Sequence, residues 1–272
     1  MEYGLCINMV ARDAEGIGMH NLPAMEKAGF DFVEIPVMKS MALSRSQFTE
    51  LVVKPLEDQP LPCKVMNSYS GPDLLMIGPQ ADKDKVYDYT CEAMDRASML
   101  GAETVVFGSG VSRATPVGMS REKGLAELME VIRMTGDEAQ KRGITLAVEQ
   151  LNRQETNVLY TLPEAAQFVS MVDHENVGLL VDYFHFTLGG EDYAYVEKYA
   201  GLLTHTHFAR MMGRVLPVDE REDTGYRAFL RALIAGGYNK TISMEANCAS
   251  DLEETAARSL QMLRGIVDSL LA

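Results

Sequence analysis

The sequence lacks the features of several classes of protein. Its 272 residues include 25 Lys and Arg against 39 Asp and Glu, which gives a formal net charge of −14. Such a charge repels a phosphate backbone, so we do not expect a nucleic-acid partner. No run approaches the roughly 18 apolar residues of a membrane span, and the start, Met-Glu-Tyr-Gly, does not resemble a secretory signal. We therefore expect a soluble, cytoplasmic protein with no membrane partner.

Cysteine pairs, glycine-rich fingerprints and linkers are also missing. The four cysteines are far apart and form no Cys-x-x-Cys pair, so we interpret them as buried thiols. No Gly-x-Gly-x-x-Gly follows the first expected strand, which argues against a nucleotide cofactor. No Ser/Gly-rich or Pro-rich tract divides the chain, and 272 residues suit one α/β barrel of about 250 residues. We expect a single domain over residues 1–272.

Strand and helix patterns alternate along the whole chain. Eight short apolar runs predict strands, near 3–9, 31–37, 62–69, 103–108, 143–149, 176–182, 202–208 and 240–246. Amphipathic segments after them predict helices, near 15–29, 44–58, 82–100, 120–142, 162–172, 191–200, 224–236 and 251–271. Eight such units predict an α/β fold, a single (β/α)8 barrel. The main competitor is an open doubly wound sheet, which would gather ligands at one switch point rather than at four successive strand ends.

Four expected strands in the second half each carry a metal-type ligand at or near the C-terminal end. These residues are Glu149, Asp182, His207 and Glu245. A parallel barrel brings the C-terminal ends of its strands together on one face, so the four side chains can surround one ion. Three carboxylates and an imidazole suit Mn²⁺ first, with Mg²⁺, Co²⁺, Fe²⁺ and Zn²⁺ as alternatives. The competing interpretation is that the carboxylates only cap helices, which is less able to explain all four together.

The same strand ends carry motifs that resemble a known family. They are VEQLNRQET at 148–156, VDYFH at 181–185, HTHFARMMGR at 205–214 and SMEA at 243–246, with GFDFVEIPV at 29–37 and LGAETVVFGSG at 100–110 less specific. In this order they resemble the sugar phosphate isomerase/epimerase superfamily, built on xylose-isomerase-like TIM barrels. The ketose 3-epimerase branch, which includes D-tagatose 3-epimerase, is the most similar.

The resemblance implies a chemistry for the four strand-end residues. Glu149, Asp182, His207 and Glu245 would hold the metal, and Glu149 and Glu245 would also be the catalytic acid/base pair. In the family mechanism the metal polarises a ketose carbonyl, one carboxylate removes the neighbouring proton, and the second returns a proton to the resulting cis-enediolate. Protonation from the opposite face inverts the carbon, whereas delivery to the other carbon interconverts aldose and ketose.

Residues near these ligands are expected to bind substrate. Glu155 and His185 match the substrate-side carboxylate and imidazole of the family. Arg214 would stabilise negative charge on the substrate oxygens, although its spacing from His207 is one residue longer than the family's, and Arg210 competes for the role.

The positions of two further residues on the expected strands suggest a role for each. Glu34 closes the second expected strand and resembles the family's polar residue that faces the substrate, with a plain salt bridge as the alternative. We expect His205 to pack between barrel and helices, on the far side of its strand from His207.

The predicted function is a divalent-metal-dependent sugar epimerase or isomerase that acts on a ketose or related polyol. The alternatives are an inosose-type dehydratase or a hydroxypyruvate isomerase on the same scaffold, and a sugar-binding barrel without catalysis. An endonuclease for abasic DNA fits badly, because its multi-zinc site needs more than the five histidines present. The sequence leaves open the sugar, its phosphorylation, the native metal and whether the chain forms a homo-oligomer.

Overall fold

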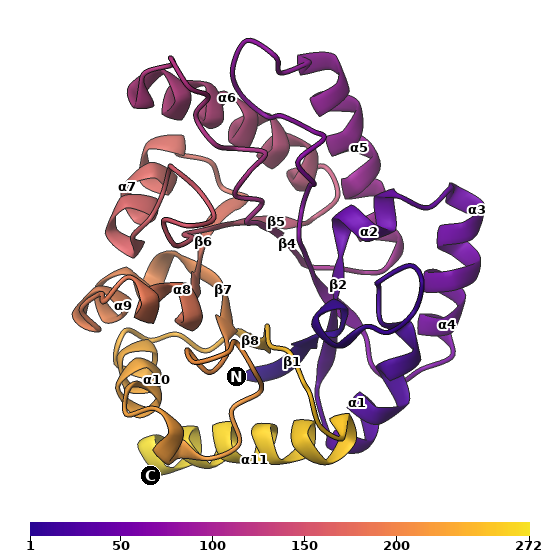
Figure 1. The fold of residues 1–272 in the computed structure, drawn as a ribbon, viewed down its shortest axis with the longest axis vertical. Coiled ribbons are helices and arrows are strands. Elements are labelled where there is room, and N and C mark those ends of the chain that lie inside the picture. The colour runs from indigo at the N-terminus through magenta and orange to yellow at the C-terminus, as the bar shows by residue number, and fades with distance from the viewer.

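A computed structural model describes all residues, 1–272, and shows a closed parallel barrel inside a ring of helices (Figure 1). Its eight strands pair in sequence order, and β8 closes the barrel against β1. Their bounds are β1 Glu2–Cys6, β2 Phe32–Pro36, β3 Cys63–Asn67, β4 Thr104–Phe107, β5 Thr145–Glu149, β6 Val177–Asp182, β7 Leu203–Phe208 and β8 Thr241–Met244. The predicted (β/α)8 barrel is confirmed, and the open sheet is excluded.

The helices lie outside the strands. They are α1 Leu22–Ala28, α2 Val37–Met41, α3 Arg45–Phe48, α4 Lys54–Glu57, α5 Lys83–Met99, α6 Arg121–Gln140, α7 Leu162–Val172, α8 Tyr183–Leu188, α9 Ala194–Tyr199, α10 Gly225–Ala235 and α11 Leu252–Leu271. Short 3-10 helices are η1 Ile7–Val10, η2 Met19–Asn21, η4 Ala200–Leu202 and η5 Glu220–Glu222, and η3 Thr49–Val53 is a π-helical turn between α3 and α4. In Figure 1 the last helix, α11, lies beside α1, and their contact closes the ring.

Local chemistry explains where the long helices begin. The side chains of Asp82, Ser120, Thr161 and Asp251 each accept a hydrogen bond from a backbone N–H in the first turn of α5, α6, α7 and α11. These bonds satisfy donors that have no partner within the helix.

The prediction of a helix over 15–29 was too long. Only 22–28 is α-helical, because the preceding segment forms a tight turn around Asp13, whose carboxylate accepts from the N–H groups of Ile17 and Gly18. Gly18 there has φ of 94°, a conformation that favours glycine. The short helices α2 and α8 directly follow strands and were not predicted, since each is little more than one turn long.

An apolar layer fills the barrel below the strand ends that carry the polar residues. Phe32, Val65, Val106, Ala147 and Leu180 form this layer, and all are buried. A second, larger core of 69 buried residues lies mainly between strands and helices. The strands are therefore covered on both faces, which explains why they read as continuous apolar runs.

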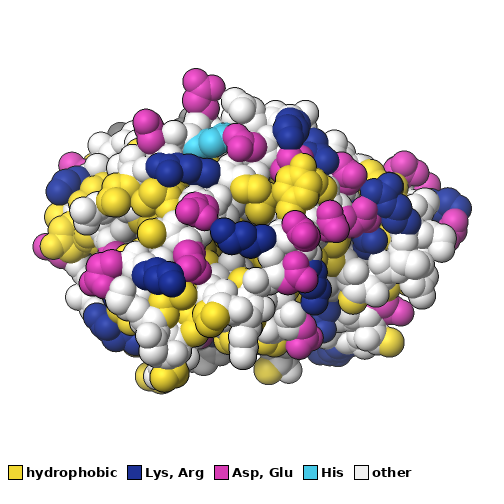
Figure 2. Space-filling model, turned by 90° about the horizontal axis from the view of Figure 1, so that it is seen from above, with side chains coloured by type: hydrophobic (Ala, Val, Ile, Leu, Met, Phe, Trp, Pro, Cys, Tyr) yellow, Lys and Arg dark blue, Asp and Glu magenta, His cyan; other side chains and the backbone are white.

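The outer surface mixes charges of both signs. Figure 2 shows Lys and Arg side chains scattered among Asp and Glu on one side of the barrel, with small apolar groups between them. Every helix is too short or too polar to pass through a lipid bilayer.

Gly4 provides a test of the barrel interior. It pairs with Phe32 in the β1–β2 ladder, and a Cβ atom at position 4 would overlap the buried Phe32 ring. We expect Gly4→Ala to lower the free energy of unfolding by about 1–3 kcal/mol, as overpacked cores do. Urea unfolding followed by circular dichroism measures this loss.

The matched control is Gly265→Ala, on the exposed side of α11, where a Cβ would meet no atom within 4 Å. There the same change should raise stability by about 0.5–1 kcal/mol, because alanine favours a helix. Equal stability of the Gly4→Ala variant and the wild type would show that the Phe32 ring can move away at no cost.

Candidate metal centre

The structure brings together the four strand-end residues singled out in the sequence. Glu149 and Asp182 end β5 and β6, His207 lies near the end of β7, and Glu245 follows β8 directly. One ligand atom from each lies within 4.8 Å of the others. Glu149, Asp182 and His207 are buried, and the Glu245 side chain is 12% exposed. The C-terminal ends of these parallel strands thus lie close together on one face of the barrel, as expected.

His207 presents one ring nitrogen to this group and the other to the barrel interior. Its Nδ1 lies 3.3 Å from Glu149 Oε1 and 3.2 Å from Glu245 Oε2. Its Nε2 lies 2.9 Å from Oε1 of Glu34, which is fully buried. Glu34 therefore lies behind His207 rather than on the surface of the cavity, where the sequence had placed it.

The interpretation of His205 as a residue between barrel and helices was wrong. Its Nε2 lies 3.0 Å from the second oxygen of Glu34, and its Nδ1 lies 2.7 Å from Thr241 Oγ1. Residues two apart on a regular strand point to the same face, so His205 and His207 both enter the barrel.

Arg214 reaches the carboxylates from the loop after β7. Its Nη2 donates to Asp182 Oδ2 at 3.1 Å and also to Glu245 Oε2, and its guanidinium stacks over the Phe184 ring at 4.7 Å. The loop is fixed by Asn247, whose N–H donates to the Arg214 carbonyl at 2.8 Å. Arg210, the competing candidate, pairs instead with Glu222.

His185 and Glu155 lie beside the group rather than within it. His185 is buried, and its Nε2 lies 3.4 Å from Asp182 Oδ2. Asn152, which the sequence analysis did not single out, directs its side-chain Nδ2 at His185 Nδ1 (2.9 Å) and donates to Glu155 Oε1 (2.8 Å). This arrangement leaves Nε2 as the protonated nitrogen of His185, facing the carboxylates. Glu155 is 43% exposed, and its Oε1 lies 3.9 Å from Arg214 Nη1.

Two residues near the end of β4 support the group, and the sequence analysis assigned neither of them to it. A Cβ at Gly108 would overlap the Glu149 carboxylate, so the glycine leaves space for that side chain. Arg113 is fully buried and donates to the carbonyls of Phe107 (2.9 Å) and Glu149 (2.6 Å), which ties the ends of β4 and β5 together. No local pattern in the sequence distinguishes Arg113 from a surface arginine, and none indicates that Gly108 would face a carboxylate.

The carboxylates occupy different electrostatic environments. Burial raises the pKa of Glu149, and it raises the pKa of Asp182 to about 6 despite the nearby Arg214. Burial also acts to raise the pKa of Glu245, but Arg214 and then His207 outweigh it and lower that pKa to about 2. The balance between burial and nearby positive charge therefore moves the pKa values of these carboxylates in different directions.

A cavity of about 280 Å³ opens above the group. Glu149, His207 and Glu245 form part of its lining, together with Glu155, His185 and Arg214. Another part of the wall comes from the end of β3 and the loops after β3 and β4, and it is rich in neutral polar groups: Asn67, Ser68, Ser70 and Ser109.

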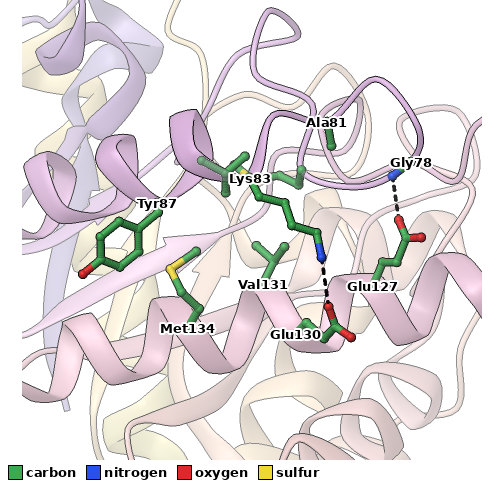
Figure 3. A pocket seen from close by; sticks show the side chains of 10 residues that line it. Gly78, Ala81, Lys83, Tyr87, Glu127, Glu130, Val131 and Met134 are labelled. Atoms are coloured by element: carbon green, nitrogen blue, oxygen red, sulfur yellow. Dashed lines mark hydrogen bonds and ion pairs between the residues drawn. The ribbon is translucent and has the colours of Figure 1, made fainter.

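A groove on the outside of the barrel has a different character. It lies between α5 and α6, and its lining is mainly apolar, with Val131 and Met134 among the residues drawn in Figure 3. Its two carboxylates are already engaged, Glu127 by the Gly78 N–H at 2.8 Å and Glu130 by Lys83 at 3.5 Å. The cavity at the barrel mouth is therefore the candidate active site.

Known proteins resemble the chain over nearly its whole length. The chain is 24% identical over 262 residues to the ketose 3-epimerase of Arthrobacter globiformis, an alignment that covers 93% of this chain and 86% of the relative. The crystal structure of D-psicose 3-epimerase with D-tagatose from Clostridium cellulolyticum H10 matches with a TM-score of 0.83 at 19% identity, covering 98% of this chain and 99% of that one.

A structure of the IOLI protein with a binding zinc atom matches with a TM-score of 0.72 at 17% identity, and the match covers 100% of this chain and 98% of that one. The family profile described as "Xylose isomerase-like TIM barrel" matches residues 22–266. The chain therefore belongs to the xylose isomerase-like TIM barrel family, as the resemblance of its strand-end motifs indicated.

Proposed function

We propose that this protein is a divalent-metal-dependent ketose epimerase in which Glu149 and Glu245 exchange protons with the substrate. The observation that carries the proposal is the placement of these two carboxylates in one cavity, on strand ends separated by β6 and β7. His207 Nδ1 lies between them, at 3.3 and 3.2 Å. Inversion of a carbon needs one group to remove a proton and another to return it from the opposite face. The name of the Arthrobacter relative supports a ketose substrate.

The donor set fits a divalent cation. Glu149, Asp182, Glu245 and Nδ1 of His207 would hold it, because their ligand atoms converge within 4.8 Å and are mostly hard donors. The contact of the Arg214 guanidinium with two of these carboxylates supports the proposal that the position favours positive charge. Mn²⁺ is the first choice. When bound, the ion supplies a Lewis acid that acidifies the C–H beside a carbonyl.

Other side chains of the cavity suit the binding of substrate oxygens. His185 is oriented by Asn152 so that Nε2 is a hydrogen-bond donor. Arg214 and Glu155 flank the same space from two loops, and the arginine is positioned to stabilise oxygens that become negative during proton transfer.

The neutral polar part of the cavity wall favours an unphosphorylated sugar. Asn67, Ser68, Ser70 and Ser109 offer neutral amides and hydroxyls, which match the hydroxyls of a sugar chain. Arg214 is the only Lys or Arg in the cavity lining, and it already contacts Asp182 and Glu245. A terminal phosphate would therefore meet three nearby carboxylates without a free cation to pair with.

Proton exchange with solvent tests the reaction. In D₂O, we expect the Mn²⁺-loaded protein to incorporate deuterium at C3 of a ketose and to form its C3 epimer, which NMR detects. Exhaustive chelation should abolish both signals, and Mn²⁺ should restore them. Incorporation at C1 with formation of an aldose would assign aldose–ketose isomerisation instead. Full turnover in a verified metal-free sample would contradict the metal-dependent mechanism.

Glu245→Gln separates proton transfer from metal binding. The amide keeps an oxygen that can bind the metal but cannot accept or return the substrate's proton. Turnover should therefore fall by roughly 10²-fold or more, while the metal stays bound with lower affinity. Turnover and metal content are measured on the same sample. The control is Glu253→Gln on α11, the same change outside the cavity, which should leave both values unchanged. Near wild-type turnover in metal-loaded Glu245→Gln would exclude this residue as an acid/base group.

A pair of histidine variants separates substrate contact from metal binding. His207→Ala should lose the ion on dialysis, because it removes one of four donors, whereas His185→Ala should keep the ion and lose turnover. Metal content after dialysis against metal-free buffer is measured by elemental analysis. Equal loss from both variants would mean that His185 also holds the metal, and equal retention would exclude His207 as an essential ligand.

A further inference from the structure

A chain of polar groups, fully buried at Glu34, His205 and His207 and partly buried at Thr241, crosses the barrel interior beneath the candidate metal centre. Thr241 Oγ1 lies 2.7 Å from His205 Nδ1, and His205 Nε2 lies 3.0 Å from Glu34 Oε2. The other Glu34 oxygen lies 2.9 Å from His207 Nε2. Glu34, His205 and His207 are each 0% exposed, and they come from β2 and β7, which are not neighbours in the sheet. These hydrogen bonds therefore connect β2 to β7 across the barrel interior and end at His207, one of the candidate metal ligands.

The hydrogen-bonding roles along this chain follow from chemistry. A carboxylate oxygen accepts, so the ring nitrogens that face Glu34 must each carry a proton. With its proton on Nε2, a neutral His207 has a lone pair on Nδ1, and this atom faces Glu149 and Glu245. His205 Nδ1 is then an acceptor, and the Thr241 hydroxyl donates to it. In this arrangement both Glu34 oxygens, both Nε2 atoms and His205 Nδ1 have suitable partners, and only the lone pair on His207 Nδ1 is left for a metal ion.

We propose that Glu34 is a positioning residue that holds His207 in the tautomer and ring orientation that present Nδ1 to the metal. His205 and Thr241 support it by completing the hydrogen bonds of the buried carboxylate. Hydrogen bonds of this kind commonly fix the tautomer of a metal-binding histidine and increase its basicity. This inference rests on the proposed function, because it takes His207 as a metal ligand.

A competing possibility is a second metal site. Cys6, Glu34 and His207 each offer a ligand atom within 4.8 Å of the others, and all three are buried. However, both Glu34 oxygens and both Nε2 atoms are already paired with one another. A second ion would have to displace the protons of both pairs in a space closed to solvent. The positioning role therefore predicts one metal ion per chain.

The experiment titrates metal-free protein with Co²⁺ and records both the affinity and the visible absorption spectrum of the bound ion. In Glu34→Gln the amide oxygen can still accept from His207, while its NH₂ group faces His205, which can switch tautomer and donate to Thr241. We expect affinity to fall by about 10-fold in this variant and by about 100-fold in Glu34→Ala, which leaves Nε2 of both imidazoles without its carboxylate partner. The spectrum should change in both.

Two further variants distinguish positioning from general destabilisation. His205→Phe removes a side chain that gives no atom to the metal, yet it should weaken Co²⁺ binding by about 10-fold through the loss of support for Glu34. Glu138→Gln removes a buried carboxylate of α6 that pairs with Lys141 and Arg142 just beyond the helix, and it should lower the melting temperature without changing Co²⁺ affinity or spectrum. If Glu34→Ala does not fold, Glu34→Gln and His205→Phe provide the same comparison.

The outcomes separate the two proposals. One equivalent of Co²⁺ in the wild type, with unchanged affinity and spectrum in the Glu34 variants, would overturn the positioning role and leave the proposed function intact. No Co²⁺ binding by the wild type would overturn the proposed function and the positioning role with it. Two equivalents, one of them lost in Cys6→Ser, would identify a second metal site instead.

Discussion

The mouth of the barrel depends on the balance of charge around three carboxylates. Glu149, Asp182 and Glu245 converge because three strand ends converge, and like charges removed from water raise the free energy of the folded state unless they are paired or protonated. Arg214 and His207 supply part of the compensation through direct contacts. If all three carboxylates are ionised, the five residues together carry a net negative charge even when Arg214 and His207 are both positively charged. A divalent cation at this position would thus stabilise the folded state, and the same ion would be the Lewis acid of the proposed reaction.

The barrel divides the work between strands and loops. The four candidate ligands lie on strand ends or directly after them, where the backbone ladder fixes their positions. Arg214 and Glu155 instead come from loops, and the hydrogen bond from Asn247 holds the Arg214 loop in place. Loops vary more readily than strands, so a family can keep its metal site and change its substrate. This division explains why the strand-end motifs indicate the family but leave the sugar undefined.

The sequence predicted the barrel and the gathering of the four ligand-type residues, because both follow from the order and periodicity of strands. It could not place Glu34, whose partners lie on β7 and become visible only when the barrel closes. Arg113 was missed for a related reason, since its carbonyl partners carry no side-chain signature. The choice between Arg210 and Arg214 depended on the path of one loop, which spacing does not encode. His205 is different, because the period of a strand was sufficient to place it beside His207.

The buried Glu34 group shows how this barrel uses its interior. Phe32, Val65, Val106, Ala147 and Leu180 form an apolar layer, whereas Glu34 and two imidazoles occupy the space above them. Replacing a buried charged group by apolar side chains is often neutral or stabilising, so stability alone does not require such a group. The proposed role explains the group, because the orientation of His207 then matters more than the stability that an apolar layer would add. Full pairing of both Glu34 oxygens limits the energetic penalty, and the same pairing prevents His207 from rotating.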